Sequence, residues 1–94
     1  MTVIQERIPV AELLAGLAEE ATELAQAALK LRRCYDKTNP TPADPDIQYE
    51  RFLEEIGDVW LYIDQLSVNI PIIEDYKQAK LKRWVQRVAH GCAE

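Results

Sequence analysis

Apolar residues recur every three or four positions along residues 10–35, among Ala, Leu and Glu residues that favour helices. This spacing places the apolar side chains on one face of an α-helix, because a helix turns about 100° per residue. The positions along the centre of that face are Leu13, Leu17, Glu20, Leu24, Ala27 and Leu31. The pattern predicts one long amphipathic helix whose packing face contains a single acid, Glu20.

The same period returns in residues 47–69. One face of this segment carries Phe52, Ile56, Val59, Ile63 and Leu66, and other faces carry Leu53, Trp60 and Leu61. A helix that is apolar nearly all round must be covered on several sides. Trp60, Tyr62 and Trp84 could stack on a ligand, but aromatic residues at helical spacing are more often core residues, so all three are expected in the core.

Prolines and a glycine predict where the helices end. Residues 36–46 contain three prolines, which cannot continue a helix and which predict a stiff loop. Pro71 suits the first turn of a third helix, and Gly91 suits its end. The chain is therefore expected to be a single all-α domain over residues 1–94, with two helices facing each other across a loop and a third following.

Size makes self-association an expectation. A chain of 94 residues buries only about two-thirds of the surface that it exposes when unfolded, so a few helices alone are marginally stable. A second copy of the chain is the simplest way to complete the bundle. We therefore expect a homo-oligomer, either a dimer or a tetramer.

Composition and charge argue against several classes of protein. The chain is 48% hydrophobic and 29% charged, a balance typical of globular proteins. It has no apolar run of the roughly 20 residues that span a bilayer and no secretory signal, so we expect a cytoplasmic protein without a membrane partner. The net charge of −5 argues against a nucleic-acid partner.

Cys34 and Cys92 are predicted to be free thiols, and the single His90 is given no role.

Two pairs of acids stand where packing alone would favour apolar residues. Glu20 and Glu23 are three residues apart, and Glu55 and Asp58 are three apart in an apolar stretch of the second helix. Side chains at this spacing begin roughly 5–6 Å apart on a helix surface, so each pair is repulsive. Facing pairs of buried carboxylates require a divalent cation as compensation. Because the ligands are all oxygens, we expect Mg²⁺, with Mn²⁺ able to substitute for it.

The alternative is that these acids form solvated faces or salt bridges, as most helical Glu residues do. Four basic residues are available as partners: Lys30, Arg32, Arg33 and Arg51. Glu19 and Glu54 each precede a paired acid by one residue and therefore point about 100° away from it. Spacing alone leaves metal binding and salt bridging equally open.

The run Glu19-Glu20-Ala21-Thr22-Glu23, followed by Glu55-Ile56-Gly57-Asp58, resembles the EExxE and ExxD motif pair of MazG-like all-α nucleotide pyrophosphohydrolases. The likeness extends from Leu14 to Arg83 and includes the Asn39-Pro40-Thr41-Pro42 loop of small phage-type and bacterial members. It implies a MazG-like helical bundle completed by homo-oligomerisation. It also implies Mg²⁺-dependent hydrolysis of an NTP or dNTP to the monophosphate and pyrophosphate, as housecleaning of the nucleotide pool.

The same resemblance implies roles for individual residues. The metal ligands carried over from it are Glu20, Glu23, Glu55 and Asp58. The candidate catalytic residues are Glu19 and Glu20, either of which would accept the proton of the attacking water. Because the chain is shorter than larger family members, part of the base pocket is expected from a neighbouring subunit.

Substrate contacts are expected from the last helix and from the loop. Basic residues recur at three- and four-residue steps at Lys77, Lys80, Arg83 and Arg87. Lys80 and Arg83 are the preferred phosphate-binding pair, with a merely solvated basic face as the alternative. Asn39 is a candidate contact to the base or sugar, although Asn before Pro also opens turns.

Two other functions compete with hydrolysis. The first is a non-catalytic helical interaction module, in which the acids are structural and the second helix is an oligomer interface. The second is a carboxylate-bridged redox protein with a ferritin-like bundle. Such sites usually add His in a Glu-x-x-His motif, and the only histidine here lies outside the acidic motifs, so this class is disfavoured.

Overall fold

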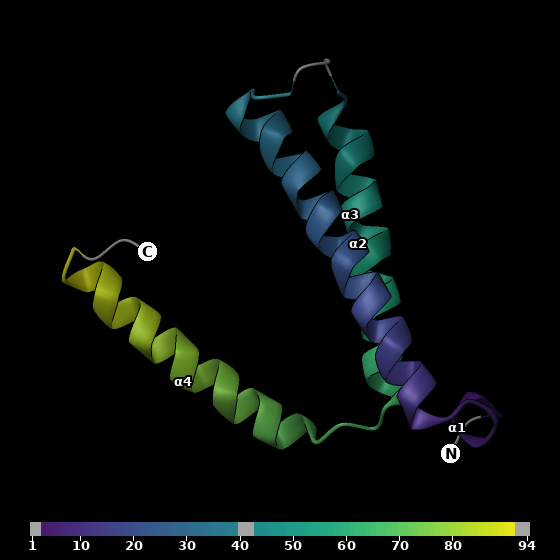
Figure 1. Ribbon diagram of the computed structural model, residues 1–94. Helices are drawn as coiled ribbons and strands as arrows, with labels where there is room; N and C mark the ends of the chain where they lie inside the picture. The colour runs from purple at the N-terminus through teal and green to yellow at the C-terminus, as the bar shows by residue number, and fades with distance from the viewer. Residues whose placement is uncertain (1–2, 40–42, 92–94) are drawn as a thin grey trace.

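The computed structural model describes residues 3–39 and 43–91 and contains, in those ranges, four α-helices and no strand (Figure 1). The helices are α1 (Val3–Arg7), α2 (Val10–Asp36), α3 (Pro45–Gln65) and α4 (Ile70–Ala89). α2 and α3 run side by side in opposite directions as a hairpin, and α4 projects away from it. The predicted all-α class is confirmed. None of the helices described is both long and apolar enough to cross a membrane.

Side-chain caps and prolines start α3 and α4. α3 begins at Pro45, and the Asp44 carboxylate before it accepts a 2.9 Å hydrogen bond from the backbone N–H of Asp46. Asn69 caps α4 in the same way, accepting a 3.1 Å hydrogen bond from the N–H of Ile72. The start of α3 lies inside the segment expected to be a loop, because proline is tolerated in a first turn, where its missing N–H has no helical partner.

Left-handed residues end α2 and separate α3 from α4. Lys37 follows α2 with φ of 61°, and its N–H bonds back to the carbonyl of Arg33. Ser67 has φ of 51°, so the second helix ends at Gln65 instead of continuing to residue 69 as expected. Gly91, with φ of 76°, lies just beyond α4, as predicted. The short helix α1 was not expected from the sequence.

The hairpin core is built from the predicted packing faces. On α2, Leu13, Ala27 and Leu31 are buried, and the intervening seam positions are half-buried. On α3 the predicted face is half-buried throughout, at Phe52, Ile56, Val59, Ile63 and Leu66. Both faces are therefore confirmed as packing surfaces. The burial is shallow, since no described residue of α3 or α4 is fully buried.

Much apolar surface remains exposed in the single chain. Trp60 is 63% exposed on α3, and Trp84 and Val88 are 52% and 59% exposed on α4. The expectation that both tryptophans are core residues is therefore wrong within one chain, because no described helix covers them. The radius of gyration is 17.1 Å, whereas a compact chain of this length has about 12 Å.

Gly16 permits a close contact between the two hairpin helices. It is buried on α2, and a Cβ added there would overlap the outer part of the Tyr62 ring on α3. Gly57, in the middle of α3, has open space where its Cβ would lie. Alanine at either position gains the same helix propensity, so the two substitutions differ mainly in the overlap with Tyr62.

We expect Gly16→Ala to lower the free energy of unfolding by about 1 kcal/mol, because overpacking at Tyr62 outweighs the gain in helix propensity. The matched control Gly57→Ala should raise it by up to about 1 kcal/mol. Urea titration followed by circular dichroism, at one protein concentration, measures both. Equal stabilisation by the two alanines would show that Tyr62 does not pack on Gly16.

Candidate metal centre

Three glutamates meet across the interface between α2 and α3. Glu20 and Glu23 come from consecutive turns of α2, and Glu55 comes from α3. One carboxylate oxygen from each lies within 4.8 Å of the other two. Glu20 and Glu55 are half-buried, and Glu23 is exposed. Because Glu20 and Glu23 are three residues apart, both lie on the side of α2 that faces α3. The antiparallel packing of α3 places Glu55 at the same height along the hairpin axis.

This crowding makes ionisation of the cluster unfavourable. Partial burial raises the pKa of Glu20 above its usual value, and the charges of Glu23, Asp58 and Glu55 add to that rise. Partial burial likewise raises the pKa of Glu55, with further contributions from Glu23, Asp58 and Glu54. Lost hydration and like charge act in the same direction at both groups. Added positive charge, whether a proton or a metal ion, would therefore relieve the repulsion within the cluster.

Two oxygens of the cluster lack the partners that buried polar atoms normally have. Oε2 of Glu20 and Oε2 of Glu55 are shielded from solvent and accept no hydrogen bond from any described residue. Ligand oxygens at about 2.1 Å from Mg²⁺ lie roughly 3 to 4 Å from one another in an octahedral shell. The 4.8 Å spread of the three glutamates is thus slightly wider than the shell of one ion. Small side-chain rotations, or two ions side by side, match it, so the donor set fits Mg²⁺.

Asp58 lies beside this group without being one of its three members. It is exposed on α3, one helical turn beyond Glu55. Its negative charge nevertheless raises the pKa of both Glu20 and Glu55. Glu19, one residue before Glu20, is exposed and likewise lies outside the three-acid group. The structure therefore brings together three of the four expected ligands and keeps Asp58 within electrostatic reach.

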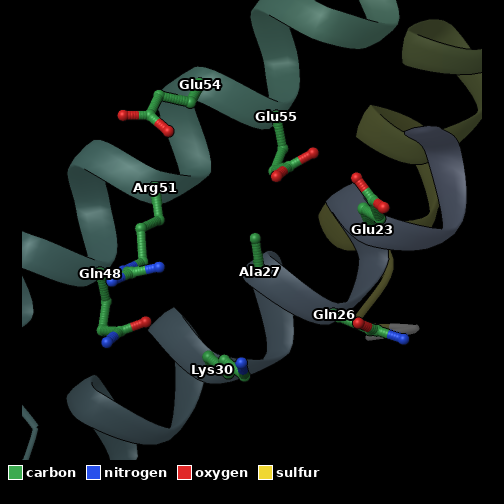
Figure 2. A pocket seen from close by; sticks show the side chains of 8 residues that line it. All are labelled: Glu23, Gln26, Ala27, Lys30, Gln48, Arg51, Glu54 and Glu55. Atoms are coloured by element: carbon green, nitrogen blue, oxygen red, sulfur yellow. The ribbon is translucent and has the colours of Figure 1, made fainter.

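A polar cavity of about 330 Å³ adjoins the acids. Its lining residues are Glu23, Gln26, Ala27, Lys30, Gln48, Arg51, Glu54 and Glu55. Figure 2 shows Glu23 and Glu55 facing each other from opposite helices, with Ala27 between the helices and Arg51 reaching from α3 toward α2. Ala27 is the only apolar residue of this lining.

Sequence reasoning assigned Lys30 and Arg51 only as salt-bridge partners and missed their place in the cavity. The spacing of these residues along each helix does indicate that they lie near the acids. Lys30 is seven residues after Glu23, and Arg51 is four before Glu55, so each shares a helix face with an acid of the cluster. Pairing the two faces requires knowing the register of α2 against α3, which spacing within one helix does not contain.

The expected substrate contacts lie elsewhere in the chain. Lys80 and Arg83 are exposed on α4 and do not line the cavity beside the acids. Asn39 lies at the loop end of the hairpin, where its side chain forms long hydrogen bonds of 3.4 Å with Arg33 Nε and with the thiol of Cys34. Cys34 is a free thiol, as predicted. Pro40 to Pro42 and Cys92 lie outside the described residues.

Comparisons with models of known protein families, with curated proteins and with solved structures find no match to this chain. The structure by itself establishes a small all-α protein with three long helices and a cluster of three glutamates, Glu20, Glu23 and Glu55, that is suited to a metal ion.

The raised pKa values give the cluster a defined effect on stability. A carboxyl group whose pKa is higher in the folded chain than in the unfolded chain favours folding when protonated, so its contribution falls as pH rises through the folded pKa. In EDTA at pH 7, Glu55→Gln should therefore melt at a higher temperature than the unsubstituted chain, and the difference should shrink toward pH 5. Thermal melts at both pH values measure this.

The matched control is Glu50→Gln, an exposed acid on the same helix outside the cluster. It should change the melting temperature little at either pH, because surface charges contribute little to stability. A lower melting temperature for Glu55→Gln at pH 7 would contradict the electrostatic description of the cluster.

Proposed function

We propose that this protein is a Mg²⁺-dependent nucleoside triphosphate pyrophosphohydrolase that converts an NTP or dNTP to the monophosphate and pyrophosphate. The observation that carries the proposal is the convergence of Glu20, Glu23 and Glu55 beside a polar cavity. Catalysis of phosphoryl transfer depends on stabilising charge and positioning groups more than on covalent chemistry by the protein. Carboxylate ligands beside a cavity for an anion meet that requirement.

The motif resemblance supports the same function. The EExxE and ExxD runs that resemble MazG-like enzymes contain Glu20, Glu23 and Glu55, the same three residues that the fold brings together. Asp58, the last acid of the second run, is proposed as a fourth ligand. It is exposed, lies one turn from Glu55, and its charge acts on both Glu20 and Glu55, so it is close enough to contribute to a shared site.

The residues of the cluster have separate tasks in this proposal. Glu20, Glu23, Glu55 and Asp58 would hold the metal, which when bound neutralises phosphate charge and lowers the pKa of a nearby water. Glu20 or Glu19 accepts the proton of that water as its oxygen bonds to the α-phosphorus. The bond between this phosphorus and the oxygen bridging to the β-phosphate breaks, and pyrophosphate leaves with the electron pair.

Self-association belongs to the same proposal. The first turns of α4 and the face of α3 line an open apolar cavity of about 370 Å³ that includes Trp60, Ile70 and Ile73. Farther along α4, Leu81, Trp84 and Val88 remain exposed. Exposed apolar faces of this kind are typical of interfaces. A second copy supplies matching faces, and it is the source that we propose for Lys80, Arg83 and Asn39 as substrate contacts.

A non-catalytic interaction module is the competing proposal, and the exposed apolar faces of α3 and α4 favour it equally. What separates the two is the acid cluster. An interaction module has no use for two solvent-shielded oxygens without hydrogen bonds, since unpaired buried oxygens only destabilise it. An enzyme binding Mg²⁺ uses both of them as ligands.

Turnover tests the enzymatic proposal directly. Purified protein is incubated with a panel of NTPs and dNTPs, in Mg²⁺ or in EDTA, and the nucleotides, phosphate and pyrophosphate are resolved. We expect monophosphate and pyrophosphate in equal amounts with Mg²⁺ or Mn²⁺ and none with EDTA. Glu55→Gln should lower the rate on the order of 100-fold or more, because it removes transition-state charge stabilisation, whereas Glu50→Gln should not.

No turnover across the panel, together with no rise in melting temperature on adding Mg²⁺, would favour the interaction module instead. Release of inorganic phosphate and a nucleoside diphosphate would show that the bond between the β- and γ-phosphates is cleaved, and would contradict the proposed reaction.

Sedimentation or light scattering tests self-association. The unsubstituted protein should have two or four times the 10.8 kDa mass of one chain. Trp84→Glu should shift it toward the monomer, because a charge in an apolar interface is costly to desolvate. Since Trp84 is already exposed in the single chain, this change removes little packing within it. Lys82→Glu, an exposed polar position on the same helix, is the control, and an unchanged mass for Trp84→Glu would exclude this part of α4 from the interface.

A further inference from the structure

The cavity beside the acids has two chemically different ends. Along α2 its lining runs from Glu23 through Ala27 to Lys30, and along α3 from Glu55 through Arg51 to Gln48 (Figure 2). Because the helices are antiparallel, both sequences pass from acid to polar or basic side chains in the same direction. Lys30 lies about 10 Å from Glu23 along the helix axis, and Arg51 about 6 Å from Glu55.

Within the part of the chain that the structure describes, the two cations at this end, Lys30 and Arg51, form no ion pair with an acid. Among the described residues, the ion pairs within 4.0 Å are Arg32–Asp36 and Lys77–Glu74, and neither involves Lys30 or Arg51. Glu54 lines the same cavity, but in Figure 2 the end of the Arg51 side chain extends away from the Glu54 carboxylate, toward Gln48. Two basic side chains without ion pairs at one end of a cavity favour an anionic ligand, especially one that an Arg side chain can bind through two hydrogen bonds.

The lining also argues against a nucleobase at this end. Pockets that hold a base or another flat organic group are lined mainly by apolar and aromatic side chains. Here Ala27 is the only apolar residue, and no aromatic residue is among the lining side chains. A ligand made of charged groups in a row, one end held through a metal ion and the other by basic side chains, fits this distribution better.

We infer that Lys30 and Arg51 bind the β- and γ-phosphates of the substrate and, after cleavage, the departing pyrophosphate. The inference rests on the proposed hydrolysis at Glu20, Glu23 and Glu55, which sets the α-phosphorus at the acidic end. It gives the cavity a direction: the triphosphate tail extends along the groove between α2 and α3 toward the loop. The base and sugar are then left outside this cavity, on the side of the acids.

Binding of inorganic pyrophosphate tests the inference without turnover. Isothermal titration with pyrophosphate and Mg²⁺ is carried out on the unsubstituted protein, Lys30→Gln, Arg51→Gln and Arg51→Lys. Each glutamine variant should bind pyrophosphate about 10- to 100-fold more weakly, the range for losing hydrogen bonds to a charged group. Arg51→Lys should recover part of the affinity, since it keeps the charge but loses the paired geometry.

Two controls separate a lost contact from a lost fold. Lys82→Gln removes an exposed cation of α4 outside the cavity and should leave pyrophosphate affinity unchanged. The rise in melting temperature that Mg²⁺ alone produces should persist in both cavity variants, because the metal ligands are intact. In steady-state kinetics the same variants should raise the KM for every NTP tested by a similar factor, whichever base it carries.

The possible outcomes divide cleanly between the two proposals. Turnover with unchanged pyrophosphate affinity in both glutamine variants overturns the assignment of Lys30 and Arg51 and leaves the hydrolase intact. Changes in KM that depend on the base, with pyrophosphate affinity unchanged, also overturn it and place the base in the cavity. Pyrophosphate binding that depends on both residues, without any turnover, supports the anion site and contradicts the hydrolase.

Discussion

Like-charge repulsion inside the α2–α3 hairpin is the constraint on which the remaining features depend. The hairpin holds together through a shallow seam of Leu and Ala side chains, and Glu20, Glu23 and Glu55 lie close together at that seam, two of them half-buried and Glu23 exposed at its edge. Apolar packing can keep the carboxylates close only if their charge is compensated. Protonation achieves this at low pH, which is the meaning of the raised pKa of Glu20 and Glu55. At neutral pH a bound divalent cation would achieve the same, so the repulsion that destabilises the hairpin is also what would favour the metal in the proposed function.

The distribution of charge and apolar surface extends this argument to α4. The hairpin, residues 10–65, carries twelve acidic and five basic residues, whereas α4 carries five basic and two acidic ones. The acidic hairpin and the basic helix α4 thus have opposite charges, and both have exposed apolar faces. They have little contact with each other within one chain. Packing α4 of one copy on the hairpin of another would bury apolar surface and reduce the net negative potential around the acids. The same contact would carry Lys80 and Arg83 toward a neighbouring site, which their position in one chain does not allow.

Much of this architecture follows from the sequence alone. The period of apolar residues predicted α2 almost to its ends and located both packing faces, because helix formation and burial obey the same 3.6-residue repeat. It also singled out Glu20 as an acid on a packing face, and the structure then placed Glu23 and Glu55 beside it. The break after Gln65 was not predicted, because Ser67 adopts a left-handed conformation in a segment whose apolar pattern continues without interruption. α1 was also not predicted, because a helix of five residues is too short to show a helical repeat of apolar positions.

The cavity shows why site residues are harder to predict than helices. Lys30 and Arg51 belong to different helices, and nothing in either local pattern states that they face the same space. Their relation depends on the register of α3 against α2, to which Gly16 contributes by admitting the Tyr62 ring. A register shifted by one turn would move each side chain by about 5 Å along the axis, enough to separate Glu55 from Glu20 and Glu23. The close contact at Gly16 lies one helical turn before Glu20 and involves no charged group, yet it helps to set the register that brings the three carboxylates, and the cations beyond them, to one cavity.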